Sequence, residues 1–254
     1  MNIAVCVKQV VTRDWPLRVD ETAQWVRDHD ASFEMNEPDA YALEEALRLK
    51  EQHGGEVVVC VAGPSRVSQV IREALARGAD RAIHVRNNEL AFADANVVAC
   101  SLAHAMLSEQ FDLVLTGLQS DDQGFGQTGV ILAERLGLPH ATIVMEVDAG
   151  ETATIRVKRE LEGGWFQWVT MPSPALLTIQ SGINQLRYAT LKGIMAAKKK
   201  EVRVVEIQEL HPAGQQIVRL YSPEKEKATR FVEGAPDAAS RELVRLLSEE
   251  ARVL

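Results

Sequence analysis

Short runs of apolar residues alternate with helix-like stretches through the first half of the chain. Four runs rich in valine, isoleucine and leucine predict buried strands, at Asn2–Lys8, Glu56–Ala62, Arg81–Val85 and Leu113–Thr116. Three intervening stretches carry apolar residues at the spacing of an amphipathic helix, at Asp39–Gln52, Ser65–Arg77 and Ala93–Glu109. Pro38 before the first stretch and Gly54-Gly55 after it are typical of helix ends.

Strands separated by helices indicate an α/β fold, in which a parallel sheet carries helices on both faces. The strand runs are apolar at consecutive positions and do not alternate with polar residues, as expected when both faces of the sheet are buried. Ligands of such sheets bind beyond the carboxyl ends of the strands, where the following loops gather. Candidate ligand-binding positions are therefore the residues after Val7, around Asn36, after Ala62 and after Thr116.

A different pattern begins after residue 150. Thr152–Glu160 and Trp165–Met171 alternate apolar with polar residues, and Gly163-Gly164 between them can adopt turn conformations. We expect a β-hairpin to be inserted into the α/β fold at this point. A further strand is predicted at Ala175–Ile179, which follows two prolines.

The final part of the chain is more polar and predicts an arm. A short strand-like run, EVRVVEI, is followed by a polar stretch at Gln208–Thr229 and an amphipathic helix at Ala235–Arg252. A lone helix with apolar positions needs another surface to pack on. We therefore expect an α/β domain over residues 1–200 and a C-terminal arm over residues 201–254.

Composition excludes some classes of partner. The 254 residues include 28 Lys and Arg against 36 Asp and Glu, a net charge of -8, so neither general nucleic-acid binding nor polybasic membrane attachment is expected. No run approaches the ~20 apolar residues of a membrane span, and the N-terminus resembles neither a signal nor a transit peptide. With isolated cysteines in apolar surroundings, these features predict a cytoplasmic protein with free thiols at Cys6, Cys60 and Cys100.

The most informative segment is the glycine-rich stretch Thr116–Gly129, TGLQSDDQGFGQTG, which lies between a predicted strand and a helical pattern. The N–H groups of a helix N-terminus are unpaired, and the helix dipole adds partial positive charge there. Glycines let a ligand approach the backbone, and Gln127 and Thr128 offer side-chain donors. The pattern fits a phosphate group, although it is neither a G-x-G-x-x-G fingerprint nor a P-loop. A helix-capping loop without a ligand is the alternative.

The sequence carries no pattern for catalysis. Asp121 and Asp122 are adjacent carboxylates, but no nearby residues complete a set of metal ligands. The six histidines lack the spacing of a metal site, and neither a G-x-S-x-G elbow nor a catalytic-cysteine context occurs. We therefore expect a binding protein with no catalytic residues of its own and no bound metal.

A second informative segment is Asn184–Lys200, NQLRYATLKGIMAAKKK, a loop that passes into a helix with a basic end. Lys198, Lys199 and Lys200 can offset the negative end of that helix's dipole. The functional alternative is an exposed apolar loop beside a basic patch, which would dock an acidic partner.

Five segments stand in the order and spacing of one protein family. They are Val157–Gly164 (VKRELEGG), Asn184–Lys200 with its RYATL, IM and AKKK elements, Asn36 within MNEPDAYALEEALRLKE, Ala62–Pro64 (AGP) and Ala74–Val85 (ALARGADRAIHV). On these residues the sequence resembles the β subunits of electron-transferring flavoproteins, the ETF β family, from Met1 to about Lys200.

The resemblance implies a Rossmann-like domain of the adenine-nucleotide α-hydrolase-like type, paired with a larger α subunit in a heterodimer. FAD would be shared with that subunit, and this chain would bind a structural AMP. Electrons would come from flavin dehydrogenases, such as the acyl-CoA dehydrogenases of fatty acid β-oxidation, and would pass to a quinone oxidoreductase. The chain would be an electron-carrier subunit rather than an enzyme, and it would not insert into a membrane.

The resemblance also assigns residues to these roles. It places the nucleotide site at Cys6, Asn36, Ala62, Asp122, Gln123, Gly126, Gln127 and Thr128, of which the last two match the family's phosphate ligands. Its partner-binding residues would be Glu160, which matches an acidic residue that can pair with an arginine of the α subunit, the recognition-loop anchor Leu191, and the basic residues Lys198, Lys199 and Lys200.

Two alternatives remain open at this point. Electron-bifurcating members of the family bind a second FAD in place of AMP and usually read D-G-D-T-A-Q-V-G in the phosphate loop. This chain reads S-D-D-Q-G-F-G-Q-T-G, which favours AMP. A nucleotide-binding stress-type protein would share the fold class and would form a homodimer without flavin.

Overall fold

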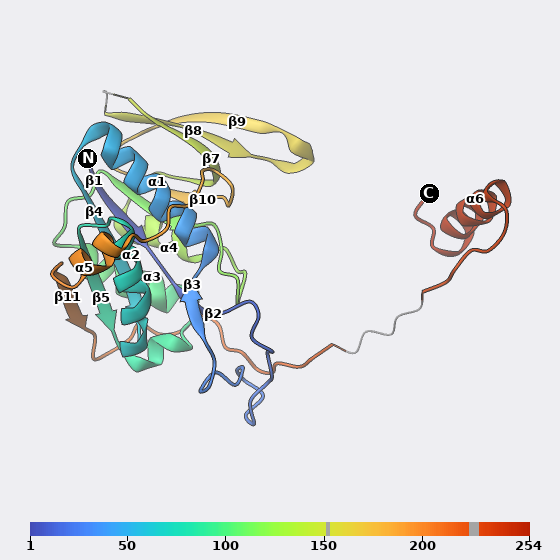
Figure 1. Ribbon diagram of the computed structural model, residues 1–254, viewed down its shortest axis with the longest axis horizontal. Coiled ribbons are helices and arrows are strands. Elements are labelled where there is room, and N and C mark those ends of the chain that lie inside the picture. Colours follow the sequence, from blue (N-terminus) through green and yellow to red (C-terminus); the bar gives the residue numbers. More distant parts are fainter. Residues whose placement is uncertain (151–152, 224–228) are drawn as a thin grey trace. The chain divides into compact units, whose positions relative to one another are not determined.

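The computed structural model describes residues 1–150, 153–223 and 229–254 of the chain (Figure 1). It divides into two compact units, Met1–Leu220 and Tyr221–Leu254. The first is an α/β domain, and the second contains α6 (Pro236–Arg245) and a helical turn at Leu246–Glu250. Thr152 of the expected hairpin and residues 224–228 of the expected polar stretch lie outside the described residues.

Within the described residues, the first unit contains a nine-stranded sheet in the order β11-β5-β4-β1-β6-β10-β7-β8-β9. The strands from β11 to β7 run parallel, and β8 and β9 complete the sheet as an antiparallel hairpin. The strands are β1 (Asn2–Cys6), β4 (Glu56–Gly63), β5 (Arg81–Arg86), β6 (Leu113–Gly117), β7 (His140–Ala149), β8 (Thr154–Glu160), β9 (Phe166–Pro172), β10 (Ala175–Ile179) and β11 (Val202–Glu206). A separate antiparallel pair joins β2 (Gln9–Val11) and β3 (Phe33–Met35).

Helices cover both faces of the sheet. One face carries α1 (Glu37–His53) and α2 (Ser68–Arg77), with α5 (Leu191–Ala197) packed against α2. The other face carries α3 (Ala95–Met106) and α4 (Thr128–Leu136). Short helical turns lie at Ser65–Val67, Asn88–Ala91 and Glu162–Gly164.

The central strands show why the apolar runs are continuous. In β4, Val57 and Val59 belong to the core on the α1 and α2 side, whereas Val58 and Cys60 belong to the core on the α3 and α4 side. All four are at most 1% exposed. A strand buried on both faces has no position for a polar side chain, so the predicted α/β fold with its parallel sheet and inserted hairpin is confirmed.

β11 belongs to the main sheet and not to an arm. It pairs in parallel with β5, and Val205 packs in the core on the α3 side. The first unit therefore extends to Leu220, beyond the boundary at Lys200 that the sequence predicts. The EVRVVEI run joins the sheet because Val205 packs in the core while the backbone of β11 pairs with the outer strand β5.

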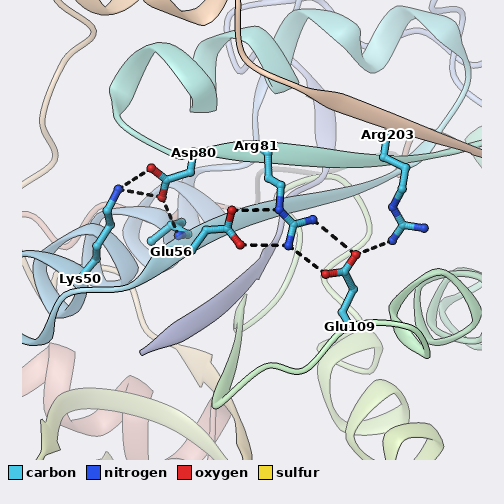
Figure 2. A network of polar contacts seen from close by, with 7 residues as sticks. Lys50, Glu56, Asp80, Arg81, Glu109 and Arg203 are labelled. Carbon is cyan, nitrogen blue, oxygen red and sulfur yellow. Dashed lines mark hydrogen bonds and ion pairs between the residues drawn. The ribbon is translucent and has the colours of Figure 1, made fainter.

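A network of charged side chains ties the amino ends of β4 and β5 to β11 (Figure 2). Arg81 donates from Nε and Nη2 to the carboxylate of Glu56 at 3.0 Å each, and from Nη2 to Oε2 of Glu109 at 2.8 Å. Arg203 donates to the other oxygen of Glu109, also at 2.8 Å. These contacts lower the pKa of Glu109, with the hydrogen bond from Arg81 as the largest cause.

Replacing Glu109 with glutamine is expected to lower the free energy of unfolding by about 1–2 kcal/mol, because the amide oxygen cannot serve both arginines as the carboxylate does. The matched comparison is Glu206→Gln, which removes the carboxylate that pairs with Arg86. The Glu206 side chain is 55% exposed and that of Glu109 only 17%. Exposed pairs contribute less than about 1 kcal/mol, so Glu206→Gln should stay near wild type. Urea denaturation at pH 7 measures both variants, and equal losses would contradict this ranking.

Candidate functional site

A cavity lies at the carboxyl ends of β1, β4 and β6. The strand order proceeds from β1 to β4 and β5 on one side and to β6 and β10 on the other, so β1 and β6 flank the point where the order reverses. The cavity is lined by Cys6 of β1, Ala62 of β4, Thr116-Gly117 of β6 and the loops that follow these strands. Doubly wound sheets bind their ligands at this position.

The structure brings most of the predicted nucleotide-site residues together. The cavity is lined by Cys6, Asn36, Ala62, Gln123, Gly126, Gln127 and Thr128, among others. Asp122 does not line this cavity and instead borders an adjoining one. Residues from four separate parts of the chain therefore meet at one edge of the sheet.

The loop between β6 and α4 presents an open helix N-terminus to the cavity. Gly124 and Gly126 have φ angles of +67° and +63°, which favour glycine. The preceding residue makes no side-chain cap to the first turn of α4, which begins at Thr128. A Cβ atom at Gly129 would lie 2.7 Å from the hydroxyl oxygen of Thr116, so glycine lets the helix begin close to the strand. The N–H groups of this first turn are therefore available to an anion.

The side chains of Gln127 and Thr128 point to the same chemistry. Both line the cavity, and neither has a hydrogen-bond partner within residues 1–150, 153–223 and 229–254. A hydroxyl and an amide beside an uncapped helix N-terminus form a donor set that suits a phosphate group.

Asn36 holds the loop in place from the opposite side of the cavity. Its Nδ2 donates to the carbonyl oxygen of Gln119 at 3.0 Å, and its Oδ1 accepts from the N–H of Asp121 at 2.9 Å. The side chain is almost fully buried, with 1% of the residue exposed. Asn36 therefore contributes to the site by fixing the loop.

Lys8 follows Val7, where the sequence predicts a candidate loop, but it is not among the site residues that the sequence reasoning singled out. Its Nζ donates to Asp122 Oδ1 at 2.7 Å, Gln123 Oε1 at 3.1 Å and Ser120 Oγ at 3.3 Å. The lysine thus connects the end of β1 to the loop before α4. Its place directly after a buried strand, at the edge where ligands bind, is the signal that could have found it.

Asp39, also missed, lies on the cavity wall beneath the loop. Its carboxylate accepts from the N–H of Lys8 at 2.7 Å and from the N–H of Gly117 at 2.9 Å. A Cβ atom at Gly117 would lie 2.5 Å from Oδ1 of Asp39, so glycine permits this close approach. Burial raises the pKa of Asp39 to about 7, although the two N–H groups act in the opposite direction.

The raised pKa of Asp39 predicts a pH-dependent stability. Between its ordinary pKa and about 7, the folded state holds a proton that the unfolded state has lost, so the free energy of unfolding falls as the pH rises through this range. We expect the wild type to lose more stability than Asp39→Asn between pH 5 and pH 8. Urea denaturation of both proteins at the two pH values measures the difference, and parallel losses would show that Asp39 does not titrate there.

The cysteines are core residues rather than reactive groups. Cys6 and Cys60 are neighbours in register on β1 and β4, and both are buried. Burial raises the pKa of both thiols, that of Cys60 to about 12. Cys100 is half-buried, and all three are free. Protonated thiols at these positions act as small apolar side chains.

A second cavity adjoins the first. The two share Lys8, Ala62, Gln123 and Phe125 on their walls. The second is lined mainly by apolar side chains, which include Leu17, Trp25, Val26, Phe33, Ile217 and Leu220, with Arg13 and Arg66 also on its wall. Such walls suit an aromatic group, and the sequence analysis did not predict this cavity.

The predicted partner-binding residues lie on other surfaces. Leu191 is the first residue of α5 and is 84% exposed. Glu160 ends β8, where its carboxylate accepts from Nε2 of Gln180 at 3.4 Å. Lys198 and Lys199 are exposed at the end of α5. None of these residues lines the cavity at β1 and β6.

Lys200 does not share the exposed position of its two neighbours. Its Nζ donates to the carbonyl oxygens of Leu75 at 2.9 Å and Ala79 at 2.5 Å, at the C-terminal end of α2. Burial lowers its pKa. Because it donates to two helix-end carbonyls, this ammonium stabilises the packing of α5 on α2, and the exposed basic patch consists of Lys198 and Lys199.

No group of three or more His, Cys, Asp and Glu side chains within the described ranges could hold a metal ion. None of the helices described is long and apolar enough to cross a membrane.

Comparison with known proteins identifies the family. The model of the electron transfer flavoprotein domain matches residues 24–210. The electron transfer flavoprotein subunit beta of Methylophilus methylotrophus is 35% identical over 98% of both chains. The chain belongs to the electron transfer flavoprotein β-subunit family. The subunit beta of Bacillus subtilis is 34% identical and the mitochondrial subunit beta of Oryza sativa subsp. japonica is 37% identical, each over the full length of both chains.

Membership of the ETF family confirms the resemblance seen in the sequence. The matched domain includes Asn36, the loop before α4 and the segment Asn184–Lys200, whereas Cys6 precedes it and the second compact unit follows it. The relatives extend over both of these parts as well.

Proposed function

We propose that this chain is the β subunit of a heterodimeric electron transfer flavoprotein and carries electrons without catalytic residues of its own. It accepts them from flavin dehydrogenases, such as the acyl-CoA dehydrogenases of fatty acid β-oxidation, and passes them to a quinone oxidoreductase. Family membership and full-length relatives named subunit beta support this proposal. We place the complex in the cytoplasm; the rice relative is named as mitochondrial.

The cavity at β1 and β6 is proposed to bind AMP. The observation that carries this proposal is the uncapped N-terminus of α4, with the unpartnered side chains of Gln127 and Thr128 beside it. These groups would hold the phosphate. The small side chains of Cys6 and Ala62, with apolar walls that include Leu90, leave a space suited to adenine.

One observation favours the alternative that this chain binds a second FAD in place of AMP. The adjoining apolar cavity shares Lys8, Ala62 and Phe125 with the first, so a nucleotide carrying a second ring system could extend into it. The loop sequence Ser120–Gly129 departs from the pattern of bifurcating members and favours AMP. The nucleotide released from the complex distinguishes the two.

FAD is proposed to lie between this chain and the α subunit, where it supplies the electron-carrying chemistry when bound. Glu160 is proposed to offer a carboxylate to an arginine of the α subunit, because within the described residues it accepts one long hydrogen bond, from Gln180. The second compact unit is proposed to pack on the α subunit. Its helix α6 exposes Leu243 and Val244 within a unit too small to bury them.

Dehydrogenases are proposed to dock on the apolar side chains of the Asn184–Lys200 segment. Tyr188, Leu191, Ile194 and Met195 are exposed there by 87%, 84%, 45% and 64%, and we call these four residues the docking surface. Lys198 and Lys199 lie beside it and would attract an acidic rim on the partner. Exposed apolar side chains gathered on one segment are typical of a protein-binding site.

Reconstitution of the complete chain tests the proposal. The chain is co-produced with its α subunit, loaded with FAD, and mixed with an acyl-CoA dehydrogenase and its substrate. We expect reduction of the complex, observed as bleaching of the flavin absorbance, and its reoxidation by a quinone oxidoreductase. A FAD-loaded heterodimer that neither flavin dehydrogenases reduce nor the oxidoreductase reoxidises would contradict the assigned role.

A further inference from the structure

We propose that Arg187 is a positioning residue that holds the docking surface in its binding conformation through a clamp with Glu44 and Glu51 of α1. The inference rests on the proposed docking of dehydrogenases at Tyr188, Leu191, Ile194 and Met195. It adds a group that does not itself belong to that surface.

The guanidinium of Arg187 engages two carboxylates at once. Its Nε and Nη2 donate to the two oxygens of Glu44 at 2.8 and 2.9 Å, a bidentate pair. Its Nη1 and Nη2 donate to Glu51 at 2.5 and 3.2 Å. The backbone N–H of Arg187 adds a fifth contact, to Glu44 at 3.1 Å. The planar fork of arginine fits this arrangement, and the ammonium of lysine does not.

The clamp has a rigid base. Glu44 and Glu51 lie two turns apart on α1, and the Glu44 side chain is only 7% exposed. Just before the clamp, Asn184 donates from Nδ2 to the carbonyl oxygen of Tyr41 at 3.2 Å and to Glu45 at 3.0 Å. The start of the docking segment is therefore fixed to α1 by two of its own side chains, Arg187 and Asn184, which bind three glutamates of that helix.

The far end of the segment is fixed to α2. Thr190 caps α5 by accepting from the N–H of Gly193 at 3.0 Å. A Cβ atom at Gly193 would lie 2.2 Å from the carbonyl oxygen of Ala76, so α5 packs backbone to backbone on α2. Lys200 then closes the contact at the carbonyl oxygens of α2. The docking surface lies between two anchored ends.

This arrangement explains how exposed apolar side chains keep a defined position. A loop that is already ordered loses less conformational entropy when a partner binds, and preorganisation of this kind raises affinity. Loss of the Arg187 guanidinium would release the start of the segment and leave the buried carboxylate of Glu44 with a backbone N–H in place of a charged partner. It would also leave the negative charges of Glu44 and Glu51 without their arginine next to the docking surface, against the acidic partner we propose.

The test uses the FAD-loaded heterodimer and measures electron transfer from an acyl-CoA dehydrogenase over a range of complex concentrations. Arg187→Gln is expected to raise the KM for the complex about ten-fold with a smaller change in kcat. Arg187→Lys is expected to lie between this variant and wild type. Reduction by dithionite, which needs no docking, should be unchanged. Arg86→Gln, which breaks an arginine–glutamate pair between β5 and β11, is the matched control and should retain the wild-type KM.

A double variant separates positioning from a general structural effect. If Arg187 acts through the docking surface, Arg187→Gln combined with Leu191→Ala should raise KM little beyond Leu191→Ala alone. Fully additive effects would overturn the inference, as would an unchanged KM for Arg187→Gln when Leu191→Ala raises it. If Leu191→Ala itself leaves KM unchanged, the docking surface is wrong and the proposed function fails at that point.

Limited proteolysis checks the conformational basis. The clamp predicts faster tryptic cleavage at Lys192 in Arg187→Gln than in wild type, with the rest of the complex cut at the wild-type rate. Should Arg187→Gln fail to fold, Glu51→Gln provides the milder change, because Glu51 is 59% exposed and Glu44 keeps its bidentate pair. Cleavage and KM at wild-type values in Glu51→Gln and Arg187→Lys together would overturn the clamp.

Discussion

Replacing Leu191 with alanine is expected to slow electron transfer from the dehydrogenase about ten-fold or more. The side chain is 84% exposed at the start of α5, so its truncation removes no core packing of this chain. An apolar anchor near the centre of an interface commonly contributes about 2 kcal/mol or more, and 1.4 kcal/mol corresponds to a factor of ten. Stopped-flow reduction of the complex by an acyl-CoA dehydrogenase measures the rate, and thermal unfolding and flavin absorbance serve as structural readouts.

The basic residues beside Leu191 provide a contrast to it. Neutralising Lys198 and Lys199 should reduce the association rate and its dependence on salt, because surface charges steer the encounter. Leu191→Ala should keep the salt dependence of the wild type. Lower thermal stability of Leu191→Ala with an unchanged transfer rate would show that the side chain packs on its own subunit.

Replacing Thr128 with valine is expected to weaken AMP binding by about 1.5–3 kcal/mol, which is the range of a hydrogen bond to a charged group. This corresponds to a dissociation constant roughly ten- to a hundred-fold higher. Valine keeps the shape of threonine and removes only the hydroxyl, and the helix N–H groups stay in place. Isothermal titration of the nucleotide-free heterodimer with AMP measures the change.

The same substitution at a distant position serves as the control for Thr128. Thr170→Val alters an exposed threonine of β9 and should leave AMP affinity unchanged. An AMP affinity of Thr128→Val equal to that of wild type would place the phosphate elsewhere than at the N-terminus of α4.

The fold could be predicted from the sequence wherever the burial of apolar residues alone determines the structure. A run such as VVVCVA in β4, which is apolar from Val57 to Ala62, is compatible with a strand covered on both faces and with little else at that length. The loop before α4 was also predictable as an anion site, because its glycines and the helix that follows are local features. Both inferences use only residues that are neighbours along the chain.

Long-range polar contacts were not predictable in the same way. Lys8 meets Asp122 across 114 positions of sequence, and Arg187 meets Glu44 across 143. From the sequence, Lys198, Lys199 and Lys200 could not be told apart as partner-binding residues. In the structure, the ammonium of Lys200 donates to carbonyl oxygens at the end of α2. β11 was assigned to an arm because one short strand gives no sign of which sheet edge accepts it.

The nucleotides bound to the purified heterodimer test the central claim most directly. The complex is denatured, and the released small molecules are separated and quantified by chromatography and mass spectrometry. The open N-terminus of α4 and the departure of residues Ser120–Gly129 from the bifurcating pattern predict one FAD and one AMP per heterodimer. Two FAD and no AMP would contradict the account and would assign the adjoining cavity to a second flavin.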